Sequence, residues 1–128
     1  LSGLFCVTIL HEWTIKIDNI KNYTASGDWI CGRFLEDALL KTDVVEEKVS
    51  TMQSGFTEPE HIHPVEVVVV IILEGDVSYK VDGKITRFTD GDFVYVKNPV
   101  KEVVVEVYKP TRCIVIRTPS VEGNKEYV

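Results

Sequence analysis

The chain has 128 residues, with 14 Lys and Arg and 20 Asp and Glu, so its formal net charge is −6. This length predicts a single domain over residues 1–128, large enough to form a core without a metal or a disulfide. The acidic balance and the lack of any basic cluster argue against a nucleic-acid partner. The longest apolar run, Val67–Leu73, is far shorter than the roughly 20 residues of a membrane-spanning helix, which argues against a membrane protein.

The composition favours strands over helices. Val, Ile and Thr together account for 42 of the 128 residues, and these β-branched side chains pack well on pleated surfaces. An all-β fold is therefore expected. The three cysteines, Cys6, Cys31 and Cys113, are widely spaced and predict neither a disulfide framework nor a thiolate zinc site. Such cysteine usage makes a cytoplasmic location the default expectation.

In chain order, the predicted elements are short strands separated by turns. Residues 1–10 are expected to form a strand rather than a signal peptide, and the alternation over 13–17 predicts a second strand. A strand over 29–34 precedes one or two helical turns over 35–41. Further strands are predicted over 44–52, 65–73, 77–81, 85–88, 93–96, 103–108 and 113–117. Strands this short, with turn signals such as Asp82-Gly83 between them, predict an antiparallel sandwich or barrel.

The segment Val67–Leu73 has no polar residue on either face of its predicted strand. Both faces should therefore be covered. In a small barrel one face of a strand points inward, and the other meets either a second sheet layer or a partner subunit. Both alternatives remain open, and the second predicts a homodimer.

Two of the three histidines, His61 and His63, are separated by one residue. On a strand this spacing places both imidazoles on one face, with Cβ atoms roughly 6–7 Å apart, which suits two ligands of one metal ion. The same alternation would put Val65, Val67 and Val69 on the histidine face, so the pocket beyond the histidines is expected to be apolar.

The surroundings of this pair resemble the cupin superfamily. The first cupin motif, G-x5-H-x-H-x3,4-E-x6-G, is matched by Gly55, His61, His63 and Gly75, and the phrase ILEGDV over 72–77 is typical of the family. The second motif, G-x5-P-x-G-x2-H-x3-N, aligns by position with residues 91–106. The resemblance covers roughly residues 42–118. It implies a cupin-type jelly-roll β-barrel with a divalent metal ion (Fe, Mn, Ni or Zn) and a small organic ligand in the barrel.

Two positions depart from the family's set of three histidines and one glutamate. The glutamate of the first motif is replaced by Val67 or, with the longer spacer, by Val68. Glu66 is adjacent, but it has the opposite parity to the histidines and is expected to point away from them. The third histidine is replaced by Glu102.

Two registers are open for the strand that begins near Glu102. If Val103, Val105 and Val107 face the barrel, Glu102 is solvated, as hydrophobicity favours. In the family register Glu102 faces inward beside Val104, and with His61 and His63 it forms a set of two histidines and one carboxylate of the kind that holds non-haem Fe(II).

A ligand pocket would need further side chains to hold a substrate. The candidates to line it are Arg33, Met52, Val67, Tyr95 and Val104, and Phe56, Arg87 and Arg117 are considered beside them. The resemblance implies a dioxygenase, an isomerase or a lyase as the possible enzyme. The alternative is a non-catalytic ligand-binding or regulatory module with a decayed metal site.

Overall fold

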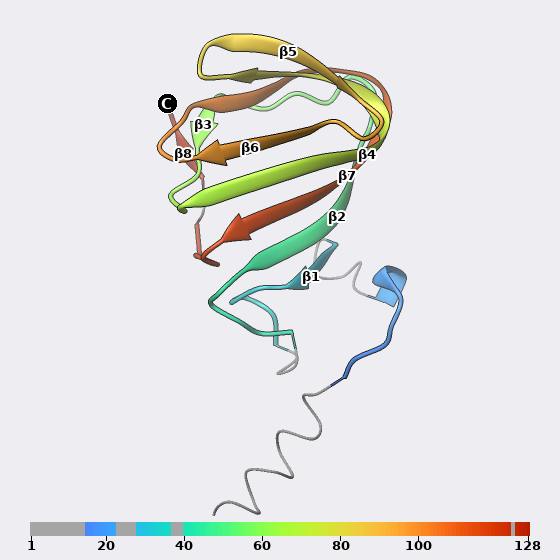
Figure 1. Ribbon diagram of the computed structural model, residues 1–128, viewed down its shortest axis with the longest axis vertical. Helices are drawn as coiled ribbons and strands as arrows, with labels where there is room; N and C mark the ends of the chain where they lie inside the picture. Colours follow the sequence, from blue (N-terminus) through green and yellow to red (C-terminus); the bar gives the residue numbers. More distant parts are fainter. Residues whose placement is uncertain (1–14, 23–27, 37–39, 124) are drawn as a thin grey trace, which may run out of the picture.

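The computed structural model describes residues 15–22, 28–36, 40–123 and 125–128, and nearly all of its regular structure is antiparallel strand (Figure 1). This confirms the expected all-β class. The strands of the described part are β1 (Trp29–Cys31), β2 (Glu46–Met52), β3 (His61–Ile62), β4 (Val67–Val81), β5 (Lys84–Thr89), β6 (Phe93–Lys97), β7 (Glu102–Thr118) and β8 (Glu126–Tyr127). No helix in this part of the chain is long and apolar enough to cross a membrane.

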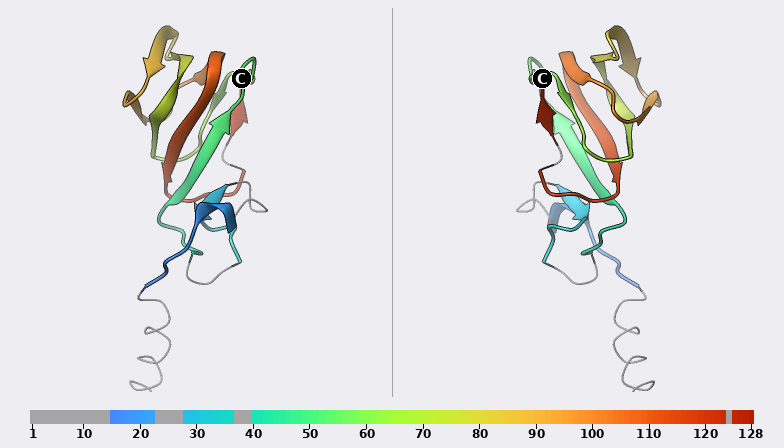
Figure 2. Two further views of the ribbon diagram at one scale, coloured as in Figure 1. Left: turned by 90° about the vertical axis from the view of Figure 1, so that its right-hand side faces the viewer. Right: turned by 90° about the vertical axis from the view of Figure 1, so that its left-hand side faces the viewer.

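The two long strands, β4 and β7, organise the sheet. They pair with each other along most of their length, from Val67 opposite Thr118 to Val81 opposite Glu102. β5 and β6 add to β4, while β2 adds to the second half of β7 and β3 to its first residue. Because both long strands bend, the sheet folds over on itself into two facing layers (Figures 1 and 2). This is the expected jelly-roll architecture.

The bend in β4 lies at Gly75, where the sequence predicted that one strand ends and another begins. β4 in fact continues through this point, and its register against β7 shifts between Ile72 and Val77. A Cβ atom on Gly75 would lie 2.2 Å from Oγ1 of Thr111, and the residue has a φ of +150°, so only glycine fits. The two strands predicted over 103–108 and 113–117 are likewise one strand, β7. Pairing between β4 and β7 therefore keeps each strand continuous across residues whose local sequence favours a turn.

The core lies between the two layers. On the first half of β4 the buried residues are Val68, Val70 and Ile72, while Val67, Val69 and Ile71 are only half-buried on the outer face. The predicted parity, with Val67 and Val69 on the histidine face, is therefore wrong. The physical reason is that residues 63–66 are not strand, so the alternation that begins at His61 is interrupted before β4 starts.

The elements predicted over 1–10, 13–17 and 35–41 are not confirmed in the described residues. The strand expected over 1–10 lies outside the described residues, as does the start of the one over 13–17. The rest of the latter is not strand, because Ile15 and Ile17 have no sheet neighbour and are 71% and 92% exposed. Of the turns of helix expected over 35–41, residues 37–39 lie outside the described part and the others are not helical.

Candidate metal centre

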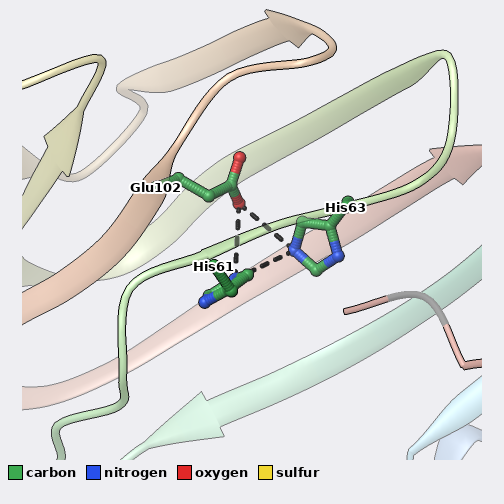
Figure 3. A group of neighbouring side chains, drawn as sticks. All are labelled: His61, His63 and Glu102. Carbon is green, nitrogen blue, oxygen red and sulfur yellow. Dashed lines mark hydrogen bonds and ion pairs between the residues drawn. The ribbon is translucent and has the colours of Figure 1, made fainter. Parts of the chain in front are cut away.

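Three side chains that bear metal-ligating atoms gather inside the barrel: His61, His63 and Glu102 (Figure 3). Each offers one ligand atom, and these atoms all lie within 4.8 Å of one another. The residues are almost completely buried, with exposed fractions of 2%, 2% and 6%. Among the described residues this is the one group of three or more His, Cys, Asp or Glu side chains arranged in this way.

The strand pairing explains why the three side chains meet. His61 on β3 is the direct antiparallel partner of Glu102 at the start of β7, so the two side chains emerge on the same face of the sheet. His63 follows two residues after His61 and turns its ring toward the same point (Figure 3). On β7, Glu102 and Val104 are buried while Val105 is exposed. Of the two registers that the sequence left open, the structure has the one with Glu102 facing inward.

The donor atoms converge at short distances. Nε2 of His61 lies 3.1 Å from Nε2 of His63, which in turn lies 3.3 Å from Oε1 of Glu102. The same Oε1 is 4.0 Å from Nε2 of His61. Two nitrogens bound to one cation at about 2.0–2.1 Å would be separated by a distance of this order.

Two further observations fit a cation bound between these atoms: a contact made by His61, and an oxygen atom of Glu102 that has no hydrogen-bond partner among the described residues. Nδ1 of His61 lies 2.9 Å from the carbonyl oxygen of Pro59. A proton on Nδ1 would be donated to that carbonyl, which leaves the Nε2 lone pair directed toward the cluster. Oε2 of Glu102 is buried and has no hydrogen-bond partner among the described residues. An unpaired buried carboxylate oxygen is costly unless a cation satisfies it.

At the position of the glutamate in the first cupin motif, this chain has no side chain that could bind a metal ion. Val68 lines the cavity, Val67 lies on the outer face, and Glu66 is exposed, as expected from its parity. The cluster therefore offers two imidazoles and one carboxylate, a set that leaves coordination positions open for water or a ligand.

A cavity of about 120 Å³ adjoins the cluster. Met52, Val68, Val70, Val104 and Val115 form an apolar part of its wall, but the rest of the wall is polar, and the valines expected to line it do not. Of the predicted pocket residues, Met52, Phe56, Val104 and Arg117 line this cavity, whereas Arg87 is exposed and paired with Asp76.

The other three predicted pocket residues lie elsewhere. Val67 is on the outer face, as described above. Tyr95 is 58% exposed and lies beside Val69 on that same outer face. The guanidinium of Arg33 is exposed, near Asp43 and Glu122. Parity could not be assigned for these positions from the sequence, because the strand registers depend on long-range pairing.

Several polar residues of the cavity were missed from the sequence. Lys48 and Ser50 lie on β2 with Met52, and Glu58, Tyr79 and Lys125 are further polar residues of the wall. Burial raises the pKa of Tyr79, so its hydroxyl stays protonated at neutral pH. The alternation over 46–52, with Glu46, Lys48, Ser50 and Met52 on one face, was the available signal for the β2 wall.

Arg117 is held in the interior by Glu46. Its Nη1 donates to Oε2 of Glu46 at 3.2 Å, and the Glu46 carboxylate also accepts from the hydroxyl of Ser120 and the backbone amide of Val121. Burial lowers the pKa of Arg117, and the charge of Glu46 opposes that effect. This buried pair joins β2, β7 and the segment after β7 at one end of the cavity.

The layered antiparallel barrel, with a histidine pair and a carboxylate inside it, has the jelly-roll architecture and the histidine pair that the resemblance to the cupin superfamily implies. Residues 48–101 match the family model of the cupin domain, which spans both histidines and ends just before Glu102. The resemblance found in the sequence is thus confirmed over residues 48–101.

Solved structures with the same fold are distant in sequence. Ectoine synthase from P. lautus has a TM-score of 0.68 at 14% identity, with 89% of this chain and 90% of that chain covered. KdgF from Halomonas sp. has a TM-score of 0.58 at 15% identity, with 63% and 74% covered. The DMSP lyase DddQ from Ruegeria pomeroyi DSS-3 has a TM-score of 0.61 at 19% identity, with 76% and 56% covered. At these identities the likeness shows the fold alone. No curated protein matches the sequence.

Proposed function

We propose that this protein binds one divalent metal ion through His61, His63 and Glu102, and a small organic ligand in the adjoining cavity. The observation that carries the proposal is the convergence of two imidazole nitrogens and one carboxylate oxygen inside the barrel, together with the unpartnered Oε2 of Glu102. Fe, Mn, Ni and Zn all accept imidazole and carboxylate ligands, so the donor set leaves the choice among them open.

The chain's own residues would prepare this site for chemistry. The Pro59 carbonyl would hold one tautomer of His61, Glu102 would offset part of the positive charge, and the valines would give the cavity an apolar side next to the metal. When bound, the metal would supply Lewis-acid or redox chemistry. The reaction classes proposed are those of a dioxygenase, an isomerase or a lyase, and similar folds include a lyase and a salicylate 1,2-dioxygenase.

The second candidate is a non-catalytic ligand-binding or regulatory module. The valines at the family's glutamate position favour it, because the metal would have one protein ligand fewer than in the family's full set. The two candidates are separated by metal affinity: a decayed site binds metal weakly or not at all.

The proposal is tested by titrating the metal-free protein with Mn²⁺ and Zn²⁺ in a calorimeter. The variants His63→Ala and Glu102→Gln should bind either metal at least about 100-fold more weakly than the wild type, because each loses a direct ligand. Glu106→Gln, on the exposed side of the same strand, is the matched control and should bind like the wild type. Equal affinity of His63→Ala and the wild type would overturn the proposal.

We also propose that the chain forms a homodimer through the outer face of the β6, β4, β7 and β2 layer. Two rows of paired residues cross this face: Tyr95, Val69 and Ile116 in one, which ends at Glu47 on β2, and Phe93, Ile71, Ile114 and Val49 in the other. Phe93 and Tyr95 are 65% and 58% exposed. An apolar patch that crosses four strands favours contact with another protein surface, and a second copy supplies the same apolar face.

A cytoplasmic location remains a proposal. It is supported by the two cysteines of the described part, Cys31 and Cys113, which are both free thiols. Free thiols persist in reducing compartments.

A further inference from the structure

Besides the His–Glu cluster, the cavity wall carries three basic side chains: Lys48, Arg117 and Lys125. Two of them are paired with carboxylates. Lys125 Nζ lies 3.2 Å from Oε1 of Glu58, and Arg117 donates to Glu46. Lys48 differs, because no carboxylate of the described residues lies within ion-pair distance of its ammonium group.

The ammonium group of Lys48 is held in place beside a second cation. Its Nζ lies 5.0 Å from the ring centroid of Trp29, and the guanidinium carbon of Arg117 lies 5.1 Å from the same centroid. Nε of Arg117 is buried and has no hydrogen-bond partner among the described residues. Burial, with the charges of Arg117 and Lys125, lowers the pKa of Lys48. Because Arg117 and Lys125 are each paired with a carboxylate, Lys48 is the one of these three cations that has no carboxylate of the described residues at ion-pair distance.

A half-buried ammonium group with no paired carboxylate is unfavourable unless an anion offsets its charge, and the Trp29 ring offsets only a part of it. The lysine stem would pack equally well as methionine, so the charge itself needs an explanation. In a cavity that also holds a candidate metal centre, a bound anionic ligand provides one.

We propose that the ligand of this cavity is a small carboxylic acid whose carboxylate binds Nζ of Lys48, while another of its oxygen atoms faces His61, His63 and Glu102. This inference rests on the proposed function, because it assigns the ligand class of the same site. The cavity volume of about 120 Å³ restricts the ligand to a few carbon atoms. Lys48 is then the residue that selects for a carboxylate and orients it.

The test uses malonate, succinate and glutarate as probes, each compared with its diamide, on metal-free and Mn²⁺-loaded protein by calorimetry. At least one dicarboxylate should bind the wild type more tightly than its diamide. Lys48→Met should weaken that binding by about 10- to 100-fold, the range expected for a hydrogen bond to a charged group. Lys48→Arg, which keeps the charge, should restore most of the affinity. The matched control is Lys97→Met, which removes the same charge from an exposed position on β6 outside the cavity.

Failure of this inference is distinguishable from failure of the proposed metal site. Because Lys48 is not one of the proposed metal ligands, Lys48→Met should bind Mn²⁺ like the wild type. If the wild type binds no metal, the proposed function fails, and Lys48-dependent binding of a dicarboxylate to the metal-free protein would still support the anion site. Equal binding of the dicarboxylates to the wild type, Lys48→Met and Lys97→Met would overturn the proposed carboxylate site at Lys48. So would equal binding of the dicarboxylates and their diamides.

Discussion

At the scale of single residues, two groups of buried charged or metal-ligating side chains differ in their environment: the candidate metal-binding cluster and a structural ion pair. His61, His63 and Glu102 converge with an unsatisfied oxygen among them, whereas Glu46 is satisfied by three donors. Glu46 is also completely buried. The cluster of His61, His63 and Glu102 has an oxygen atom without a hydrogen-bond partner among the described residues and is therefore suited to bind a ligand. The pair of Glu46 and Arg117 holds strands together.

Replacing Glu46 by Gln should destabilise the fold. The substitution keeps the shape of the side chain but leaves the buried guanidinium of Arg117 without a countercharge, and the expected loss is about 3–5 kcal/mol in the free energy of unfolding. Urea denaturation followed by circular dichroism measures it. Glu47→Gln, on the opposite face of β2, should stay within about 0.5 kcal/mol of the wild type. Equal denaturation midpoints for the two variants would contradict the role given to this pair.

The sequence predicted some of these residues better than others. His61 and His63 follow from a two-residue spacing, which is local information, and Glu102 follows from its alignment with a family motif. Val67 was placed on the wrong face because the break at residues 63–66 leaves no mark in the hydrophobic pattern. Lys48 was missed because a lysine in a strand is more often solvated than turned toward a cavity.

At the scale of elements, the bends in β4 and β7 close the barrel around the site. The β-branched composition and the turn dipeptides predicted the strands well, because both act locally. The continuity of β4 through Gly75 could not be predicted in this way. It depends on pairing with β7, whose residues are about 35 positions away in the chain.

Gly75→Ala should therefore be strongly destabilising. The new methyl group would meet Thr111 at 2.2 Å from Oγ1, and the positive φ adds backbone strain, so a loss of about 3 kcal/mol or more is expected. Thermal and urea unfolding both report it. Gly91→Ala has a positive φ but open space around the new methyl group, and should cost only about 1–2 kcal/mol. A Gly75→Ala protein as stable as Gly91→Ala would show that the close approach to Thr111 does not constrain the bend.

At the scale of the whole molecule, one layer presents an apolar outer face and the proposed dimer would cover it. Phe93→Glu or Tyr95→Glu should shift the protein toward the monomer, because each places a charge in the proposed interface without touching the core. Light scattering after size-exclusion chromatography measures the mass. Ile85→Glu, at a position 60% exposed on β5, is the control and should remain a dimer. The proposal would be wrong if the wild type ran at the monomer mass of 14.5 kDa.

Whether the barrel holds a metal ion is measured by the metal content of untagged protein purified without chelators, by plasma mass spectrometry. Close to one Fe, Mn, Ni or Zn per chain is expected. The variant His61→Ala should lose this metal while its circular dichroism spectrum remains that of a folded β protein. A wild-type protein that carries no metal, and takes up none of these cations on titration, would show that the cluster of His61, His63 and Glu102 is not a metal site.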